Sequence, residues 1–368
     1  MSRALPFSAA ALTAAAMLAS CASPSDPGTD AASLEAAAAA SSGAPRVVPQ
    51  ASGTTNALIG LDAVSPDVVW ASGAGGTFVV TTDGGRHWRA GVVPGAEGLQ
   101  FRDVQGFSAR VAYLLSIGTG TDSRIYKTED GGRTWDLQFR NPNPAAFYDC
   151  FAFWSEDRGV VFSDAVEGRF PVRRTTDGEH WRLIADRLPE ALPGEAAFAA
   201  SGTCVTARGE DQAWIVTGGA ERARVLATFD GGDTWRAFDT PIVAGVGASG
   251  GTSIEFRDGR HGMIVGGNIL NQGNVAGRNV AYTEDGGRTW RLRRHTPFIG
   301  PAYGMSYVHG TLARTVVATG PGGVGYSHDE GGSWEVLPGL EGFWSVDFAG
   351  PFSGWLVGTG GRIVKLSF

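Results

Sequence analysis

Asp103 and Asp149 stand at similar places in neighbouring parts of the chain, near the start of strand-like segments. Two carboxyl groups roughly 5 to 9.5 Å apart, one of them held protonated, can hydrolyse a glycosidic bond. Glu255 is a third candidate for such a pair. One hypothesis for the function is therefore a glycoside hydrolase that uses two of these carboxyl groups.

The strand-like segments also begin with side chains that are suited to holding a partner. Six polar and aromatic residues have this placement: Arg102, Asp103, Tyr148, Asp149, Tyr303 and Trp344. Such side chains on a rigid scaffold form a binding surface without any catalysis. Our preferred hypothesis is a non-enzymatic binding protein, because a scaffold alone does not confer chemistry. The remaining alternative is that these polar groups satisfy one another and line a wet channel.

Charge and histidine content exclude several other classes. Lys+Arg 30 stand against Asp+Glu 37, a net charge of -7, and no basic stripe of the kind that binds nucleic acid is present. The six histidines do not have the spacing of metal ligands. We therefore expect no nucleic acid, no metal and no cofactor.

A short repeat indicates the elements that must position these residues. The pattern Ser/Thr-x-Asp-x-Gly-x-x-Trp recurs about every 44 to 55 residues, the length of a four-stranded propeller blade. An Asp that opens a tight turn accepts hydrogen bonds from the following N–H groups, glycines adopt positive φ, and the Trp buries its ring. Each copy therefore predicts a hairpin. The six aspartates are Asp83, Asp130, Asp177, Asp230, Asp285 and Asp329, and the copy at Asp177 is one residue short.

The two ends of the repeat region predict a closed ring. Two more strand-like segments precede each copy, so each unit predicts four strands. A seventh unit at residues 343–365 has three such segments and no copy of the pattern. The segment Val47-Val48-Pro49 resembles those that follow the hairpins and supplies the missing strand. We predict an all-β, seven-bladed propeller over residues 46–368.

This pattern resembles the BNR or Asp-box repeat of sialidases, xyloglucanase-type glycosidases, sortilin-type receptors and the photosystem II stability and assembly factor family. The unit Gly354-Trp355-Leu356-Val357-Gly358 makes the chain most similar to the last of these, within the WD40/YVTN/BNR-like superfamily. The resemblance implies a seven-bladed propeller and a non-enzymatic role in assembly. It implies a protein client, with a glycan as the other possible ligand, on the face opposite the Asp boxes.

The first 45 residues predict export. An apolar run at residues 4–18 is too short to span a bilayer, and Leu18-Ala19-Ser20-Cys21 resembles a bacterial lipobox. We expect residues 1–21 to be a lipoprotein signal peptide with its lipobox cysteine at Cys21, and residues 22–45 to be a disordered Ala/Ser/Pro-rich tether. The lipid would be the only membrane contact, in the bacterial envelope at the outer membrane. The alternative is an ordinary signal peptide in which Cys21 is incidental.

Two further cysteines, Cys150 and Cys204, stand at similar positions in neighbouring units. In an exported, oxidising compartment they predict a possible disulfide. The alternative is two small buried side chains.

Overall fold

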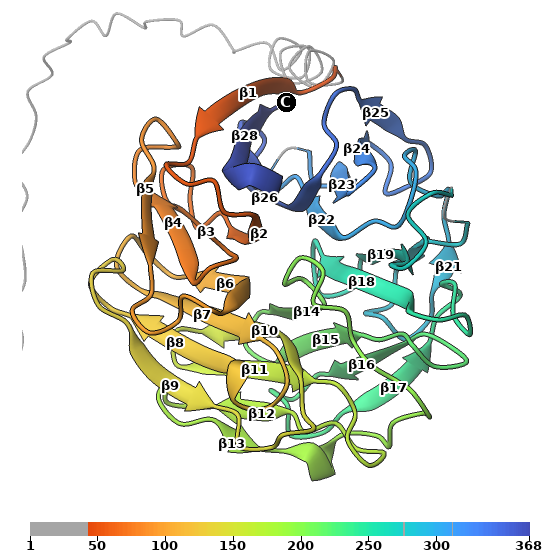
Figure 1. Ribbon diagram of the computed structural model, residues 1–368. Helices are drawn as coiled ribbons and strands as arrows, with labels where there is room; N and C mark the ends of the chain where they lie inside the picture. Colours follow the sequence, from red (N-terminus) through yellow and green to blue (C-terminus); the bar gives the residue numbers. More distant parts are fainter. Residues whose placement is uncertain (1–42, 275–276, 311) are drawn as a thin grey trace, which may run out of the picture. The chain divides into compact units, whose positions relative to one another are not determined.

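A computed structural model of the protein describes residues 43–274, 277–310 and 312–368. These residues form seven antiparallel four-stranded sheets around a common centre (Figure 1). The predicted all-β, seven-bladed propeller is confirmed. The predictions for residues 1–21, including Cys21, and for residues 22–42 of the tether lie outside the described residues.

Each of the first six blades is made of four consecutive strands. Blades 1 to 3 contain β2 (Leu58–Asp62), β3 (Val69–Gly73), β4 (Thr77–Thr81) and β5 (Arg89–Val92); β6 (Gln100–Gly106), β7 (Ala112–Ile117), β8 (Arg124–Thr128) and β9 (Asp136–Arg140); and β10 (Tyr148–Ser155), β11 (Arg158–Ser163), β12 (Arg173–Thr175) and β13 (Arg182–Leu183). Blades 4 to 6 contain β14 (Val205–Arg208), β15 (Gln212–Val216), β16 (Arg224–Thr228) and β17 (Arg236–Asp239); β18 (Ser249–Phe256), β19 (Gly262–Asn268), β20 (Val280–Thr283) and β21 (Arg291–Leu292); and β22 (Gly304–Tyr307), β23 (Val316–Gly320), β24 (Gly323–Ser327) and β25 (Glu335–Leu337).

The seventh blade joins the two ends of the propeller. It consists of β26 (Phe343–Gly350), β27 (Ser353–Gly358), β28 (Arg362–Ser367) and, at its outer edge, β1 (Arg46–Ala51). Strand β1 pairs with β28 along its whole length, and Figure 1 shows the two strands side by side. Ring closure by the N-terminal strand is therefore confirmed. It leaves β28 without an exposed hydrogen-bonding edge.

Helix is nearly absent from the described residues. Three 3-10 helices of three residues each are present: η1 (Gly120–Asp122), η2 (Ala185–Arg187) and η3 (Thr359–Gly361). Within the described ranges, no helix is long and apolar enough to cross a membrane.

Aromatic rings fill the space between neighbouring blades. Trp214 of β15 stacks on Phe256 of β18 with ring centroids 3.7 Å apart, and Trp290 meets Phe256 edge-on at 6.0 Å. Large rings with little conformational freedom fix the angle between blades as well as burying apolar area. The blades therefore form a rigid support for the loops at either face.

The repeated aspartates close the turns between the third and fourth strands. In blade 5, Oδ1 of Asp285 accepts hydrogen bonds from the backbone N–H groups of Arg288 (3.0 Å) and Thr289 (2.9 Å). Its Oδ2 accepts one from the Thr289 hydroxyl at 2.6 Å, and Thr283 Oγ1 donates to Oδ1 at 2.9 Å. These bonds stabilise the turn between the third and fourth strands. This turn lies on the same face of the propeller as the turn between the first and second strands.

We expect Asp285→Ala to lower the free energy of unfolding by about 1–2 kcal/mol, because several N–H and O–H donors lose their acceptor. Burial alone would raise the pKa of Asp285, but hydrogen bonds from Thr289 lower it overall. The stabilisation is thus present above the unfolded-state pKa and lost as pH falls through the folded-state pKa. Urea titration at pH 7 and pH 3 tests this, with the exposed Asp136→Ala as control; a difference from wild type that persists undiminished at pH 3 would contradict it.

Cys150 and Cys204 are joined by a disulfide, with their Cα atoms 5.9 Å apart. Cys150 lies in the first strand of blade 3, and Cys204 directly precedes the first strand of blade 4. The bond cross-links two adjacent blades at the innermost ring of strands.

Candidate functional site

A β-bulge near the start of the first strand sets the orientation of the residues around the central opening. In five blades, the pairing of the first strand with the second passes over one residue. The five bulged residues are Ile59, Arg102, Asp149, Thr252 and Trp344. A bulged residue is unpaired in the ladder and its side chain is re-aimed. Three of the five, Arg102, Asp149 and Trp344, line one cavity.

This cavity, which we call the mouth cavity, has a volume of ≈ 440 Å³ and lies at the face opposite the Asp turns. Segments from blades 2 to 7 contribute to it. Its lining is completed by Ile117, Phe147, Asp164, Ile269, Tyr303 and residues 196–200. The walls are largely apolar and aromatic, with a few convergent polar groups, which is the usual make-up of a ligand site.

The floor of the mouth cavity is a segment of blade 4, residues 196–202, that reaches across the axis. Its Ala199 carbonyl accepts a hydrogen bond from Arg102 Nη1 of blade 2 at 2.8 Å. Ser201 Oγ donates to the carbonyl of Tyr303, next to blade 6, at 2.7 Å. Gly202 has φ +80°, and a Cβ there would lie 2.6 Å from the Arg102 carbonyl, so only glycine fits this crossing. The segment separates the mouth cavity from a smaller channel cavity of ≈ 160 Å³.

Asp149 and Asp164 form a carboxyl pair in the wall of the mouth cavity. Asp149 is 1% exposed, and within the described residues its Oδ2 has no hydrogen-bond donor. Burial raises the pKa of Asp149 well above its usual value, and the adjacent charge of Asp164 raises it further. Burial also raises the pKa of Asp164, to about 6, against the opposing hydrogen bond from the Ala197 N–H. Because the pKa of Asp164 is about 6, this carboxyl group is negatively charged at neutral pH.

Arg102 lies against the aromatic side of the mouth cavity. Its guanidinium stacks over Trp344, 5.4 Å from the ring centroid, and the rings of Trp344 and Tyr303 are 5.1 Å apart. Besides the Ala199 carbonyl, Arg102 donates only to the neutral Gln100 side chain among the described residues. Burial lowers the pKa of Arg102 from its usual value, but the group remains a cation. Its charge is held in place without an ion-pair partner in the described part of the chain.

The channel cavity contains a second set of acidic side chains, and these are used to join blades. Each accepts a backbone hydrogen bond from the first strand of the next blade or, for Asp347, from the residue directly after that strand. The four bonds run from Gly106 N to Asp62 (2.6 Å), Phe151 N to Asp103 (2.8 Å), Tyr307 N to Glu255 (2.9 Å) and Ala63 N to Asp347 (2.6 Å). Burial raises the pKa of all four carboxyl groups. These four carboxyl groups therefore join neighbouring blades.

The structure brings together four of the six predicted binding residues: Arg102, Asp149, Tyr303 and Trp344. Asp103 faces the channel cavity instead. Tyr148 points into the core, where its ring packs on Phe139 and its hydroxyl donates to the Pro171 carbonyl at 2.7 Å. Successive side chains of a β-strand point to opposite faces of the sheet, so the side chains of Tyr148 and Asp149 point in different directions.

The predicted carboxyl pairing of Asp103 with Asp149 is not what the structure shows. The strand register matches Asp149 with Arg102, whereas Asp103 matches Cys150, one residue deeper. The partner of Asp149 is Asp164, which the sequence did not single out. The sequence feature that could have indicated Asp164 is its position directly after β11, in a loop on the face of the mouth cavity.

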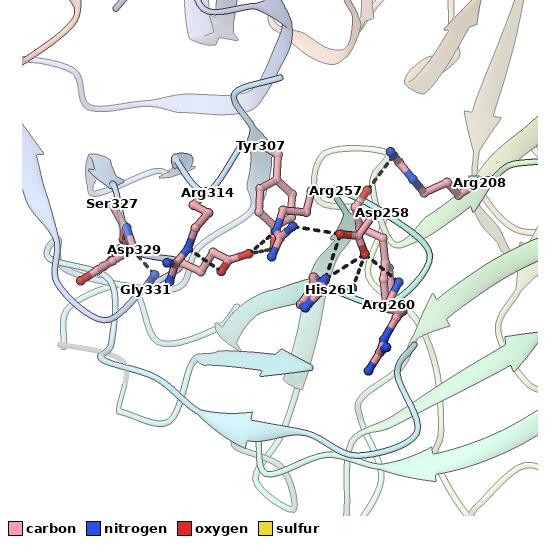
Figure 2. Close-up of polar contacts among 12 residues, drawn as sticks. Arg208, Arg257, Asp258, Arg260, His261, Tyr307, Arg314, Ser327, Asp329 and Gly331 are labelled. Atoms are coloured by element: carbon pink, nitrogen blue, oxygen red, sulfur yellow. Dashed lines mark hydrogen bonds and ion pairs between the residues drawn. The ribbon is translucent and has the colours of Figure 1, made fainter. Parts of the chain in front are cut away.

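The opposite face, around the Asp turns of blades 5 and 6, is a network of satisfied ion pairs (Figure 2). The buried Glu330 carboxylate forms ion pairs with Arg257 Nε at 2.6 Å and with Arg314 Nε at 3.2 Å. Arg257 also pairs with Asp258 at 2.9 Å, and Asp258 with His261 at 2.8 Å. These side chains form ion pairs within the protein, whereas neither Arg102 nor Asp149 forms an ion pair with another described residue. In the described ranges, no group of three or more His, Cys, Asp or Glu side chains is arranged to hold a metal ion.

The sequence matches no protein-family model, and no curated protein matches it. The fold has clear counterparts among solved structures. One described as "YCF48 bound to D1 peptide" has a TM-score of 0.59 at 14% identity, covering 89% of this chain and 97% of that one. YCF48 from Cyanidioschyzon merolae has a TM-score of 0.59 at 17% identity, covering 88% and 99%. The WD40 propeller domain of Doa1 has a TM-score of 0.55 at 14% identity, covering 88% and 97%. By its fold, the chain is a seven-bladed β-propeller similar to YCF48 and to WD40 propellers.

Proposed function

We propose that the protein is a non-enzymatic scaffold that binds a protein partner through the mouth cavity. The observation that carries the proposal is the contrast between the two faces. At the mouth, Arg102 and Asp149 are held in fixed positions without ion partners among the described residues. Around the Asp turns of blades 5 and 6, the charges of Arg257, Arg314 and Glu330 pair with one another. Fixed polar groups that lack a partner at the mouth of a rigid scaffold are suited to receive one from a bound molecule.

The loops beside the mouth cavity support a protein as the partner. Val246, Leu270 and Ile299 are 65%, 77% and 52% exposed, and they lie on three loops that hydrogen-bond to one another. Exposed aliphatic side chains beside an aromatic-lined cavity are typical of a protein interface. A fold similar to that of a propeller described as bound to a peptide agrees with this proposal.

The proposed place of action is the bacterial envelope, with a lipid on Cys21 as the membrane anchor. The lipobox sequence supports this proposal, and so does the disulfide between Cys150 and Cys204, since disulfides persist in oxidising compartments. Labelling cells with a radioactive fatty acid tests the anchor: Cys21→Ala is expected to abolish the label.

Replacing Trp344 tests the site. We expect Trp344→Ala to reduce capture of the native partner from envelope extracts by about 10- to 100-fold, because central aromatic side chains dominate interface energies. Phe352→Ala is the matched control, since Phe352 is 69% exposed in the same blade but on the Asp-turn face. Quantitative mass spectrometry of captured proteins is the measurement. Equal loss of capture with both variants would count against the mouth as the binding site.

A glycoside hydrolase is the alternative function, favoured by a carboxyl pair next to aromatic rings. Against it stands the contact between Asp149 and Asp164, which are close enough to share a hydrogen bond, whereas glycoside hydrolysis needs carboxyl groups separated by roughly 5 Å or more. We expect no turnover of polysaccharide or sialoside panels by the purified protein. Hydrolysis that Asp149→Ala or Asp103→Ala abolishes would establish the alternative instead.

A further inference from the structure

The proposed function leaves open which chemical group enters the mouth cavity. The structure offers two charged features among the lining residues: the cation Arg102, and the pair Asp149 and Asp164. Arg102 already has partners within the protein, because it stacks on Trp344 and donates a hydrogen bond to the Ala199 carbonyl. Asp149 is different, because its side chain lines the cavity and no N–H group or hydroxyl of the described residues donates to its buried Oδ2.

We propose that the mouth cavity is a socket for a cationic side chain, a lysine or an arginine of the bound partner. The inference rests on the proposed function and names the chemistry of the same site. The incoming cation would supply the donor that Asp149 Oδ2 lacks and would neutralise the charge of the carboxyl pair. A buried polar atom without a partner is costly, so a ligand that satisfies it gains affinity.

The apolar lining suits the rest of such a side chain. Phe147, Phe198, Tyr303 and Trp344 surround the cavity. The methylene stem of a lysine or arginine packs well on such surfaces, and aromatic faces attract the cationic head. A cavity of ≈ 440 Å³ holds one long side chain. The net charge of -7 on the chain also favours the approach of a cationic partner over an anionic one.

The charges that face the cavity give the socket a defined pH response. They are Asp149 from β10, Asp164 from the loop after β11 and Arg102 from β6. The Tyr303 phenol is the other titratable group in the lining, and residues 196–200 carry none. Asp164 carries a negative charge at neutral pH. Because its pKa is raised to about 6, Asp164 loses its charge below that pH, and a bound cation loses this counter-charge. Affinity should therefore be constant between pH 7 and 8 and fall by up to tenfold per unit below pH 6.

Selection of peptides from a displayed random library on the purified protein is the first test. The expected result is enrichment of peptides with one invariant lysine or arginine whose binding Trp344→Ala abolishes. For the best peptide, replacing that residue with norleucine, which keeps the stem and removes the charge, should weaken binding at least tenfold and remove the pH response. Asp164→Asn should produce the same two changes, whereas Asp186→Asn, on the linker before the site, should produce neither.

The outcomes separate this inference from the proposed function. Peptides that depend on Trp344 but carry no cation, or that carry an invariant Asp or Glu and lose affinity in Arg102→Gln, would overturn the cationic socket and leave the binding scaffold intact. If no enriched peptide depends on Trp344, the mouth cavity is not the binding site and both proposals fail. Circular dichroism of each variant checks that its fold is retained.

Discussion

Removal of residues 46–51 is expected to lower the melting temperature by about 10 °C and to cause aggregation that increases with protein concentration. Strand β1 covers the edge of β28, and its loss exposes a row of backbone donors and acceptors together with the buried side chains of Ile363 and Leu366. Several lost ladder bonds at about 0.5–1.5 kcal/mol each account for this order of magnitude. Thermal denaturation and light scattering measure the two effects.

Two controls make the expected effect of removing β1 specific. A deletion of residues 35–40, six residues from the segment predicted to be a tether, should leave the melting temperature unchanged. Gln50→Ala should give a smaller loss of about 1–3 kcal/mol, because its Oε1 accepts hydrogen bonds from both Trp88 (3.1 Å) and Trp355 (3.2 Å). A chain without β1 that melts as the wild type does would show that ring closure contributes nothing to stability.

The second large effect is expected for Glu195→Ala, at about 3–5 kcal/mol of unfolding free energy. The Glu195 side chain is fully buried and forms an ion pair with Arg224, whose Nε lies 2.9 Å from Oε1. It also accepts bonds from the Thr217 hydroxyl (2.7 Å) and the Leu192 N–H (2.8 Å). Its removal leaves the Arg224 charge buried without its partner, which is the costly way to break a buried ion pair.

Glu195 also directly precedes residues 196–202, the floor of the mouth cavity, so partner capture should fall together with stability. Glu195→Gln, which keeps the volume, should retain more of both. Glu221→Ala is the matched control, because the Glu221 side chain is 75% exposed in a surface pair with Arg222, and it should change stability by less than about 1 kcal/mol. Chemical denaturation and partner capture are the two measurements. If Glu195→Ala and Glu221→Ala behave alike, the anchoring role of Glu195 is refuted.

The candidate site could be predicted from the sequence only in part. The face was predictable, since alternate turns of a four-stranded blade lie on alternate sides, and Arg102, Asp149, Tyr303 and Trp344 do meet there. The position of Asp103 relative to Asp149 could not be predicted, because one bulged residue in each of β6 and β10 decides which side chain reaches the cavity. A bulge depends on packing between neighbouring strands and has no unambiguous local signature.

The sequence by itself determined the number of blades, the hairpins at the repeated aspartates and the closing role of residues 46–51. These features depend on local turn chemistry and on periodicity, both of which are written in consecutive residues. Only the tertiary structure decided that residues 196–202 cross the axis, that Asp149 meets Asp164, and that Asp103 joins blades. Each of these results from contacts between segments far apart in the chain, whose distances are set by how the blades pack and not by any short pattern.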